Sequence, residues 1–262
     1  MVTMFLMHDH PGWEITADNP APVRAVDSRN GSAALLNASA RPEVFRLPAG
    51  ACAALPPPLA AALRDLGPVA RFRTPSLWDA IATAIIRQVI RAGQARLQHQ
   101  RLRTAHGPAV ATERGPVHAL PSPQTILEMT DDDFAALGMT FKARPLRNAA
   151  AAYLDHSPKW AELPPGRLVE ELQTVPRIGP WTAGAATADF THDWSLYPYG
   201  DLAVRTWAAT AAPDHPWPAD EHGFAAHWRA LTGEHVGVLT LFTLALGAHH
   251  AGAPAPSPPP RS

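Results

Sequence analysis

A short loop that contains proline and glycine, VPRIGPW at residues 175–181, constrains the fold of this 262-residue chain more than any other segment. Before it, Leu168 and Leu172 share one face of a helical pattern, and Pro176 ends that helix. After it, Pro180 suits the first position of a new helix, because the N–H group that proline lacks would be unsatisfied there in any case. The sequence therefore predicts two helices that meet at a tight turn.

The turn around Ile178 and Gly179 has the properties of an anion site. The second helix directs its free N–H groups and the positive end of its dipole out of the turn, which is a ready site for a phosphate. Small residues between positions 183 and 188 would let another helix or a nucleic-acid backbone approach closely. The turn alone is equally compatible with an ordinary helix hairpin in an all-helical domain.

An acidic residue, Asp201, follows Trp181 by twenty positions and stands at the head of a third predicted helix. Because it comes after Gly200 and before an apolar periodic segment, we expect it to be a helix N-cap that accepts hydrogen bonds from first-turn N–H groups. A carboxylate flanked by Tyr197 and Tyr199 is also well placed to stabilise positive charge on a sugar. The two roles do not exclude each other.

Four segments occur along the chain in an informative order: SLWDAIATAIIRQVI at 76–90, LGMTFKARPLRNAA at 137–150, LQTVPRIGPWTA at 172–183 and YGDLAVR at 199–205. In this order they resemble the helix-hairpin-helix DNA glycosylase superfamily, and within it the bacterial 3-methyladenine DNA glycosylase II branch. The resemblance implies a mostly helical glycosylase fold with a small N-terminal antiparallel β-containing part, α+β overall. It also implies hydrolysis of the N-glycosidic bond of alkylated purines, of the 3-methyladenine or 7-methylguanine type, in base excision repair.

The resemblance assigns roles to individual residues of the active site. Asp201 matches the catalytic carboxylate of the family. Trp181 stands where strand-cutting members carry a nucleophilic lysine, so a monofunctional enzyme that uses water is implied. Trp181 also matches an aromatic residue of the base pocket, and with Tyr197 or Tyr199 it would stack on a flipped, electron-poor base.

The partner that the resemblance implies is damaged double-stranded DNA, and the wedge that fills the gap left by the flipped base matches Val89. Around it, residues 71–105 contain seven arginines and one acid, a net charge of +6, which predicts DNA backbone contact or, alternatively, a solvated helix face. The residues expected to contact DNA are Arg87, Gln88, Val89, Arg91, Arg177, Ile178, Gly179 and Thr182. The family also holds a monovalent cation, Na⁺ or K⁺, on backbone carbonyls that match Gln173, Val175 and Ile178; no other cofactor is expected.

Several positions depart from the family pattern. Arg177 replaces the first glycine of the hairpin, so its backbone must either adopt an angle unusual for a side-chain-bearing residue or reshape the turn. Ala185 replaces a second pocket aromatic, and residues 232–247 lack the tryptophan-rich stretch that lines the far wall of the pocket. A wider pocket would follow, and it leaves open a glycosylase for bulky adducts of an alkylating antibiotic. The alternative to an enzyme is a DNA-damage-binding protein that has no turnover.

Composition limits the other classes of function. The chain is 46% hydrophobic and 17% charged with a net charge of −1, which is typical of a globular protein. The single Cys52 excludes an internal disulfide and a thiolate-based zinc or iron–sulfur site. The longest apolar pattern, residues 236–248, is shorter than the ~20 residues that span a bilayer, and the first residues do not resemble a signal peptide. We expect a monomeric cytoplasmic protein of a bacterium, associated with the nucleoid through DNA and not with a membrane.

The pattern along the chain predicts three parts. Residues 1–70 hold short β-prone pieces and one helix-like piece, which predict a small α+β part. Residues 71–250 have helical patterns and would form the glycosylase domain, and residues 251–262 form a disordered, proline-rich tail. Expected helix starts are Thr74, Ser122 and Thr130.

Overall fold

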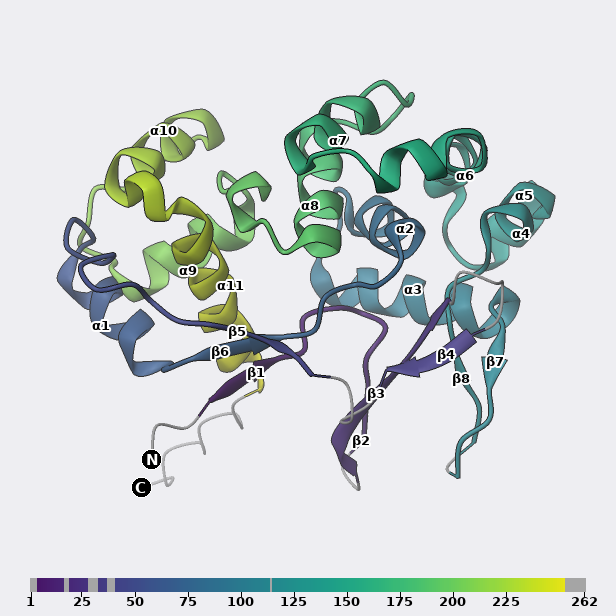
Figure 1. Ribbon diagram of the computed structural model, residues 1–262, viewed down its shortest axis with the longest axis horizontal. Helices are drawn as coiled ribbons and strands as arrows, with labels where there is room; N and C mark the ends of the chain where they lie inside the picture. Colours follow the sequence, from purple (N-terminus) through teal and green to yellow (C-terminus); the bar gives the residue numbers. More distant parts are fainter. Residues whose placement is uncertain (1–3, 17–18, 28–32, 37–40, 114, 253–262) are drawn as a thin grey trace, which may run out of the picture. The chain divides into compact units, whose positions relative to one another are not determined.

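The computed structural model describes residues 4–16, 19–27, 33–36, 41–113 and 115–252, and the protein is mostly helical, as expected (Figure 1). Its chain divides into two compact units. The terminal unit comprises Met1–His8, Val44–Arg71 and Tyr199–Ser262, and the hairpin unit comprises Asp9–Glu43 and Phe72–Pro198. The division expected near residue 70 coincides with one boundary between these units, but the residues before it contribute to both. The tail expected at 251–262 lies almost entirely outside the described residues.

The terminal unit combines a small sheet with helices. Its sheet has the order β1 (Phe5–Met7), β6 (Val69–Arg71), β5 (Glu43–Phe45). Its helices are α1 (Pro57–Asp65), α9 (Leu202–Ala211), α10 (Glu221–Thr232), the short η2 (Gly233–His235) and α11 (Val236–Gly252). Strands β1 and β6 run parallel, with Phe5 opposite Val69, whereas the sequence predicted antiparallel pairing. Parallel strands need a long connection, and these two are far apart in the sequence.

Helix α11 forms much of the core of the terminal unit. Leu239, Leu241 and Phe242 are fully buried in it, and the helix packs against α1, α9, α10 and β1. The run Glu221–His250 is long and apolar enough to cross a membrane by length and composition alone, but more than half of the qualifying window is buried inside the protein. The apolar pattern at 236–248 is therefore explained by core packing.

The hairpin unit holds the antiparallel strands that the N-terminal sequence predicted. Strands β2 (Glu14–Thr16), β3 (Asn19–Asp27) and β4 (Ala33–Leu36) form one sheet, and β7 (Ala109–Val110) pairs with β8 (Val117–His118). Its helices are α2 (Leu77–Arg87), α3 (Ala92–His106), α4 (Pro123–Glu128), α5 (Asp131–Ala136), α6 (Thr140–Ala161), α7 (Pro165–Leu172), α8 (Pro180–Thr191) and the short η1 (Trp194–Leu196).

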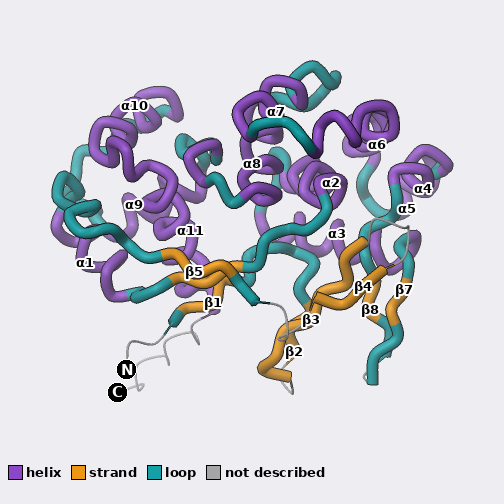
Figure 2. Tube along the Cα trace, in the orientation of Figure 1, coloured by secondary structure: helices purple, strands orange, loops and turns teal. Residues whose placement is uncertain are grey.

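Helix α2 is the centre of this unit. Every residue of α2 except the last is buried, and Figure 2 shows the helix among α3, α6 and α8, against all of which it packs. The small, buried residues of α8 permit a close approach of α2, and on η1 the approach is closer still, since a Cβ atom on Gly184 would lie 2.5 Å from the carbonyl oxygen of Leu196. The end of α2 is thereby held beside the start of α8.

Side-chain caps set several of the helix starts. The hydroxyl of Ser122 caps α4, and Thr130 caps α5 in a capping box with Asp133, as the sequence predicted for these starts. The start expected at Thr74 was wrong by two residues. Ser76 caps α2 instead, because its hydroxyl accepts from the N–H of Asp79, while Thr74 donates its own N–H to the carbonyl of Asp189.

The different surroundings of two helical glycines, Gly166 in α7 and Gly184 in α8, predict opposite effects of substitution by alanine. Gly166→Ala in α7 should raise the free energy of unfolding by about 0.5 kcal/mol, because a Cβ atom there meets open space and alanine favours helix. Gly184→Ala should lower it by roughly 1–3 kcal/mol, because the helix must shift away from a backbone carbonyl. Urea denaturation of both variants measures the difference, and equal stability would contradict the close approach at Gly184.

Candidate functional site

The predicted hairpin joins α7 to α8, and its loop has an unusual backbone. Val175 and Ile178 are buried, and the N–H of Ile178 donates to the carbonyl of Val175 at 3.0 Å. Arg177 has a φ of 75°, so it occupies the left-handed region that glycine favours. Of the two outcomes expected for this residue, the chain therefore adopts the unusual angle. Gly179 is the N-cap of α8, and no side chain caps the helix, so its N-terminal end is open to an anion.

A glutamine at the end of α2 connects that helix to the hairpin. The side-chain amide of Gln88 donates to the hydroxyl of Thr182 and, at 3.4 Å, to the carbonyl of Arg177. The hydroxyl of Thr182 thus faces α2, and the residue is buried. Thr182 and Ile178 are both buried, so the predicted contact of these two residues with DNA would have to come from their backbone. Arg177 and Gly179 remain exposed.

Val89 directly follows Gln88 and is the most exposed apolar residue described. Its relative exposure is 103%, and its φ of 58° lies in the left-handed region. That region is strained for a β-branched residue, and an exposed side chain gains no packing energy to offset the strain. Strained backbone of this kind clusters at functional sites. The position predicted for a wedge therefore combines exposure with strain.

A second exposed apolar residue, Phe141, was missed by the sequence analysis. It is 96% exposed in the first turn of α6. The next residue, Lys142, donates from its ammonium to the carbonyl of Gln88 at 2.6 Å, so Phe141 and Val89 are each adjacent to a residue of this contact. We call Val89 and Phe141 the apolar pair. A lone aromatic ring in the polar stretch between Thr140 and Arg144 was the signal in the sequence.

The arginines of residues 71–105 do not form one surface. Arg71 and Arg103 are buried, and Arg103 donates to the carbonyl of His118. The guanidinium of Arg87 is partly buried and lies 3.8 Å from a carboxylate oxygen of Asp189. The exposed arginines of the segment are Arg73, Arg91, Arg96 and Arg101. The predicted charge of +6 therefore overstates what this segment offers to a polyanion.

The residues predicted to act on the base and the sugar belong to both units. Trp181 lies in the first turn of α8 and is partly exposed, whereas Asp201 and Tyr199 belong to the terminal unit. Asp201 is the N-cap of α9, and its carboxylate accepts from the N–H of Ala203 at 3.2 Å, which confirms the predicted cap. Tyr197 is only 2% exposed and packs on Trp194, so the structure places it in the core and not on an open pocket wall.

The hairpin carbonyls could hold a monovalent cation. The carbonyl of Val175 already accepts the N–H of Ile178, but within the described residues no backbone N–H donates to the carbonyls of Gln173 or Ile178. Hard cations take oxygen ligands, and carbonyl oxygens of this kind suit Na⁺ or K⁺. The residues present therefore fit such an ion.

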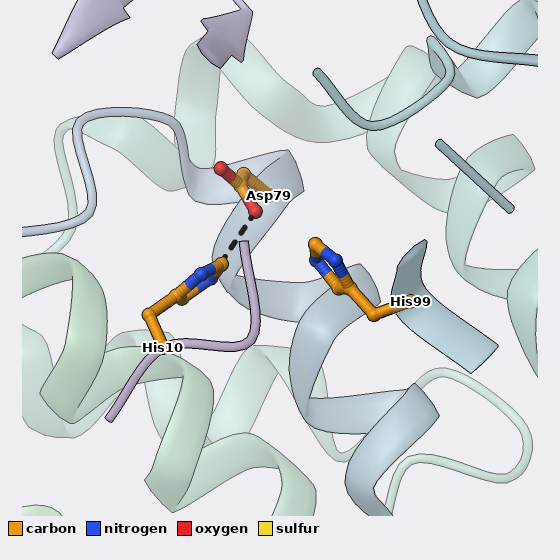
Figure 3. A group of neighbouring side chains, drawn as sticks. All are labelled: His10, Asp79 and His99. Atoms are coloured by element: carbon orange, nitrogen blue, oxygen red, sulfur yellow. Dashed lines mark ion pairs between the residues drawn. The ribbon is translucent and has the colours of Figure 1, made fainter. Parts of the chain in front are cut away.

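A buried group of His10, Asp79 and His99 has the composition of a metal site (Figure 3). Its possible ligand atoms all lie within 4.8 Å of one another. However, the hydroxyl of Thr83 lies among them, at 3.1 Å from Oδ1 of Asp79, 3.2 Å from Nε2 of His10 and 3.3 Å from Nε2 of His99. This hydroxyl can donate to the carboxylate of Asp79 and accept from both imidazoles, so hydrogen bonds alone account for the three side chains.

The protonation of His10 argues against a metal in this group. The N–H of Gly12 donates to Nδ1 of His10 at 3.0 Å, so in the neutral ring the proton lies on Nε2, the atom that faces the group. A protonated nitrogen cannot ligate a metal. The carboxylate of Asp79 also pairs with the guanidinium of Arg24. We interpret the group as a hydrogen-bond network that joins the N-terminal segment to α2 and α3.

Burial controls the ionisation of this network. It lowers the pKa of His10 to about 4, with a contribution from Arg24, and it lowers the pKa of His99 well below its ordinary value. For Asp79, burial alone would raise the pKa, but the guanidinium of Arg24 and the hydrogen bond from His10 together outweigh it and hold the pKa below the ordinary range. Both imidazoles are therefore neutral at pH 7.

The sequence matches no protein-family model and no curated protein. Solved structures are similar in fold. The apo form of the 8-oxoguanine glycosylase/lyase of Clostridium acetobutylicum has a TM-score of 0.68 at 14% identity, over 91% of this chain and 89% of that one. The 3-methyladenine DNA glycosylase of Archaeoglobus fulgidus has a TM-score of 0.64 at 17% identity, over 92% and 91%. The chain therefore has the fold of DNA glycosylases, and identities this low show the fold alone.

The buried histidines predict that acid destabilises the protein. Between pH 6.5 and about 4 the unfolded chain binds a proton at His10 that the folded chain excludes, so the free energy of unfolding falls as the pH falls through this window. His99 acts in the same direction, while Asp79 and its partner Arg24 stay charged. His10 contributes up to about 3 kcal/mol between pH 7 and pH 4.

Urea denaturation at pH 7.5, 6 and 5 measures this dependence. A His10→Gln variant should show a shallower loss, because it removes one of the two groups that take up protons on unfolding. A variant of the exposed His222 to Gln is the matched control and should follow the wild type. Constant stability across these pH values would show that the network is protonated in the folded state.

The left-handed backbone at Arg177 predicts an order of stability among its variants. Arg177→Ala keeps the strain, which costs an L-residue about 1–2 kcal/mol. Arg177→Gly relieves it but loses roughly 0.5–1 kcal/mol of backbone entropy. We therefore expect the glycine variant to exceed the alanine variant by about 0.5–1 kcal/mol in free energy of unfolding. If the alanine variant is as stable as the glycine variant, the loop does not hold this angle in solution.

Proposed function

We propose that this protein is a monofunctional DNA glycosylase that hydrolyses the N-glycosidic bond of a damaged purine in double-stranded DNA. One observation carries the proposal: Val89, fully exposed in a left-handed backbone, is tied through Gln88 to a hairpin with an open helix N-terminus. The fold supports it, because the glycosylase of Clostridium acetobutylicum with the same fold has been crystallised with double-stranded DNA.

The hairpin would hold the DNA backbone. A phosphate placed at the start of α8 meets the positive end of the helix dipole and the N–H of Gly179. Arg177 adds an exposed cation beside this position, and Arg91 adds one close to the apolar pair. Carbonyls of Gln173, Val175 and Ile178 would hold Na⁺ or K⁺, which would supply a further positive charge for the phosphate. These contacts carry no base specificity.

The apolar pair would enter the base stack. A purine inside a duplex cannot be reached until it is turned out of the helix, which costs a few kcal/mol of unstacking. An apolar side chain inserted at the vacated position takes over the lost stacking contacts. Val89 and Phe141 are exposed on the hairpin unit, beside the turn that Gln88 ties to the hairpin. They therefore suit insertion while the hairpin holds the backbone.

Asp201 would act on the sugar of the flipped nucleotide. As the bond between the base and C1′ breaks, the sugar gains positive charge, and a fixed carboxylate stabilises that charge while water attacks C1′. A hydrogen bond from Ala203 fixes one oxygen of Asp201. No amine occupies the position of Trp181, so a Schiff base cannot form there and the strand would stay intact.

We propose an alkylated purine, of the 3-methyladenine or 7-methylguanine type, as the substrate. Such a base already carries positive charge, so it leaves without strong acid catalysis and stacks well on the rings of Trp181 and Tyr199. The buried Ala185 adds no ring to this set, which is compatible with bulkier adducts. We further propose that the protein acts as a monomer on DNA in the cytoplasm.

The Asp201→Asn substitution tests the proposed reaction. Asparagine caps a helix about as well as aspartate, so folding should be kept while the charge is lost. We expect base release from methylated duplex DNA, measured by chromatography, to fall at least about 100-fold, with lesion binding retained. Asp220→Asn is the matched control, because Asp220 caps α10 in the same unit and should be dispensable for the reaction.

The outcomes separate the alternatives. Release by the wild type and by Asp220→Asn but not by Asp201→Asn supports the proposal. Equal release by all three proteins would remove Asp201 from the chemistry. If the wild type binds lesion DNA tightly but releases no base from methylated DNA or from DNA with bulky alkyl adducts, the protein is a damage-binding protein without turnover.

A further inference from the structure

Lys142 is an unusual residue for the position it occupies. It is 8% exposed, and the two acceptors of its ammonium are backbone carbonyls, those of Ile85 at 3.0 Å and Gln88 at 2.6 Å. Among the described residues no carboxylate pairs with it. Burial lowers the pKa of Lys142 to about 8. A buried cation without an ionic partner costs stability, so a purely structural cap would be better made by a less polar residue.

The two carbonyls mark where α2 gives way to the turn that carries Val89. The carbonyl of Ile85 accepts the N–H of Gln88 at 3.3 Å, and Lys142 adds a second, charged donor to it at the negative end of the helix dipole. Gln88 is the C-cap and has left the helical conformation, with a φ of −54° and a ψ of 132°. Its carbonyl belongs to the peptide bond that precedes Val89. Lys142 therefore holds the peptide from which the strained Val89 projects.

The side chain of Gln88 is held by the hairpin, through the hydroxyl of Thr182 and the carbonyl of Arg177. The main chain and the side chain of Gln88 are thus bonded to two different elements, α6 and the hairpin loop. Val89 itself is fully exposed and gains nothing from packing. The geometry of the turn consequently depends on the hydrogen bonds around Gln88.

We propose that Lys142 is a positioning residue, whose ammonium holds the end of α2 so that Val89 and the adjoining Phe141 are presented to DNA as one rigid pair. The same residue anchors both members, because it bonds the peptide before Val89 and directly follows Phe141 in the sequence. This inference rests on the proposed function only in naming DNA as the molecule into which the apolar pair inserts. The rigidity of the turn is a property of the protein alone.

The first measurement is made without DNA. Amide hydrogen exchange of residues 86–91 is compared among the full-length wild type, Lys142→Met and Lys142→Arg. Methionine keeps the apolar stem and removes the donors, whereas arginine keeps a cation. We expect Lys142→Met to exchange in this segment about tenfold faster with the rest of α6 unchanged, and Lys142→Arg to restore much of the protection. Unchanged exchange in Lys142→Met would overturn the proposal.

The second measurement follows insertion. Duplex DNA with 2-aminopurine beside an abasic-site analogue brightens when the fluorescent base is unstacked, and anisotropy reports binding of the same duplex. We expect Lys142→Met to bind within about threefold of the wild type but to lose most of the brightening, as Val89→Ala does. The double variant should lose no more than either single variant, since both remove one function. Lys159→Met, on an exposed part of α6, is the matched control.

Each result has one meaning. A proportional loss of binding and brightening in Lys142→Met would show that Lys142 contacts DNA directly, and this would overturn a positioning role. Additive losses in the double variant would do the same. If the wild type itself gives no brightening, the proposed insertion into DNA fails, and the exchange experiment alone decides the role of Lys142. Should Lys142→Met not fold, Lys142→Gln, which keeps a donor group, replaces it in both measurements.

Discussion

The close packing of α2 against α8 is the contact on which the hairpin unit depends. The small, buried residues of α8 permit this packing, and at Gly184 they also let η1 approach so closely that one methyl group would collide with the carbonyl of Leu196. This packing fixes the position of two helix ends. The C-terminal end of α2, with Val89, is held beside the N-terminal end of α8, where an anion would bind. The proposed wedge and the proposed phosphate site would therefore share one support through Gln88.

The same region departs from the rules that stabilise the rest of the protein. Val89 and Arg177 occupy left-handed backbone, and Lys142 buries an ammonium on carbonyls. Each of these features lowers stability, and the surrounding hydrogen bonds maintain them. A loss of stability of this kind is expected at a site that binds a ligand, because residues chosen for core packing alone would avoid it. Asp79, at the opposite end of the same helix, belongs to a buried network in which its carboxylate and His10 are hydrogen-bonded.

Sequence reasoning located the elements that local chemistry determines. Proline and glycine around residue 178 predicted the hairpin, and Asp201 and Thr130 were predicted as helix caps and are caps in the structure. It failed where burial decides. Tyr197 was expected on a pocket wall but lies in the core, Arg103 was counted as a surface charge but is buried, and the exposure of Phe141 was not foreseen.

The sequence by itself determined the helix hairpin and the caps at Ser122, Thr130 and Asp201, because caps, prolines and glycines act on neighbours within a few positions. It also supplied the candidate residues for the proposed glycosylase chemistry. Only the tertiary structure decided which of these residues can reach a ligand. That depends on pairs far apart in the chain, such as Gln88 with Thr182 and Lys142 with Ile85. Burial, tautomer and strain are properties of such contacts, and a linear pattern of side chains does not contain them.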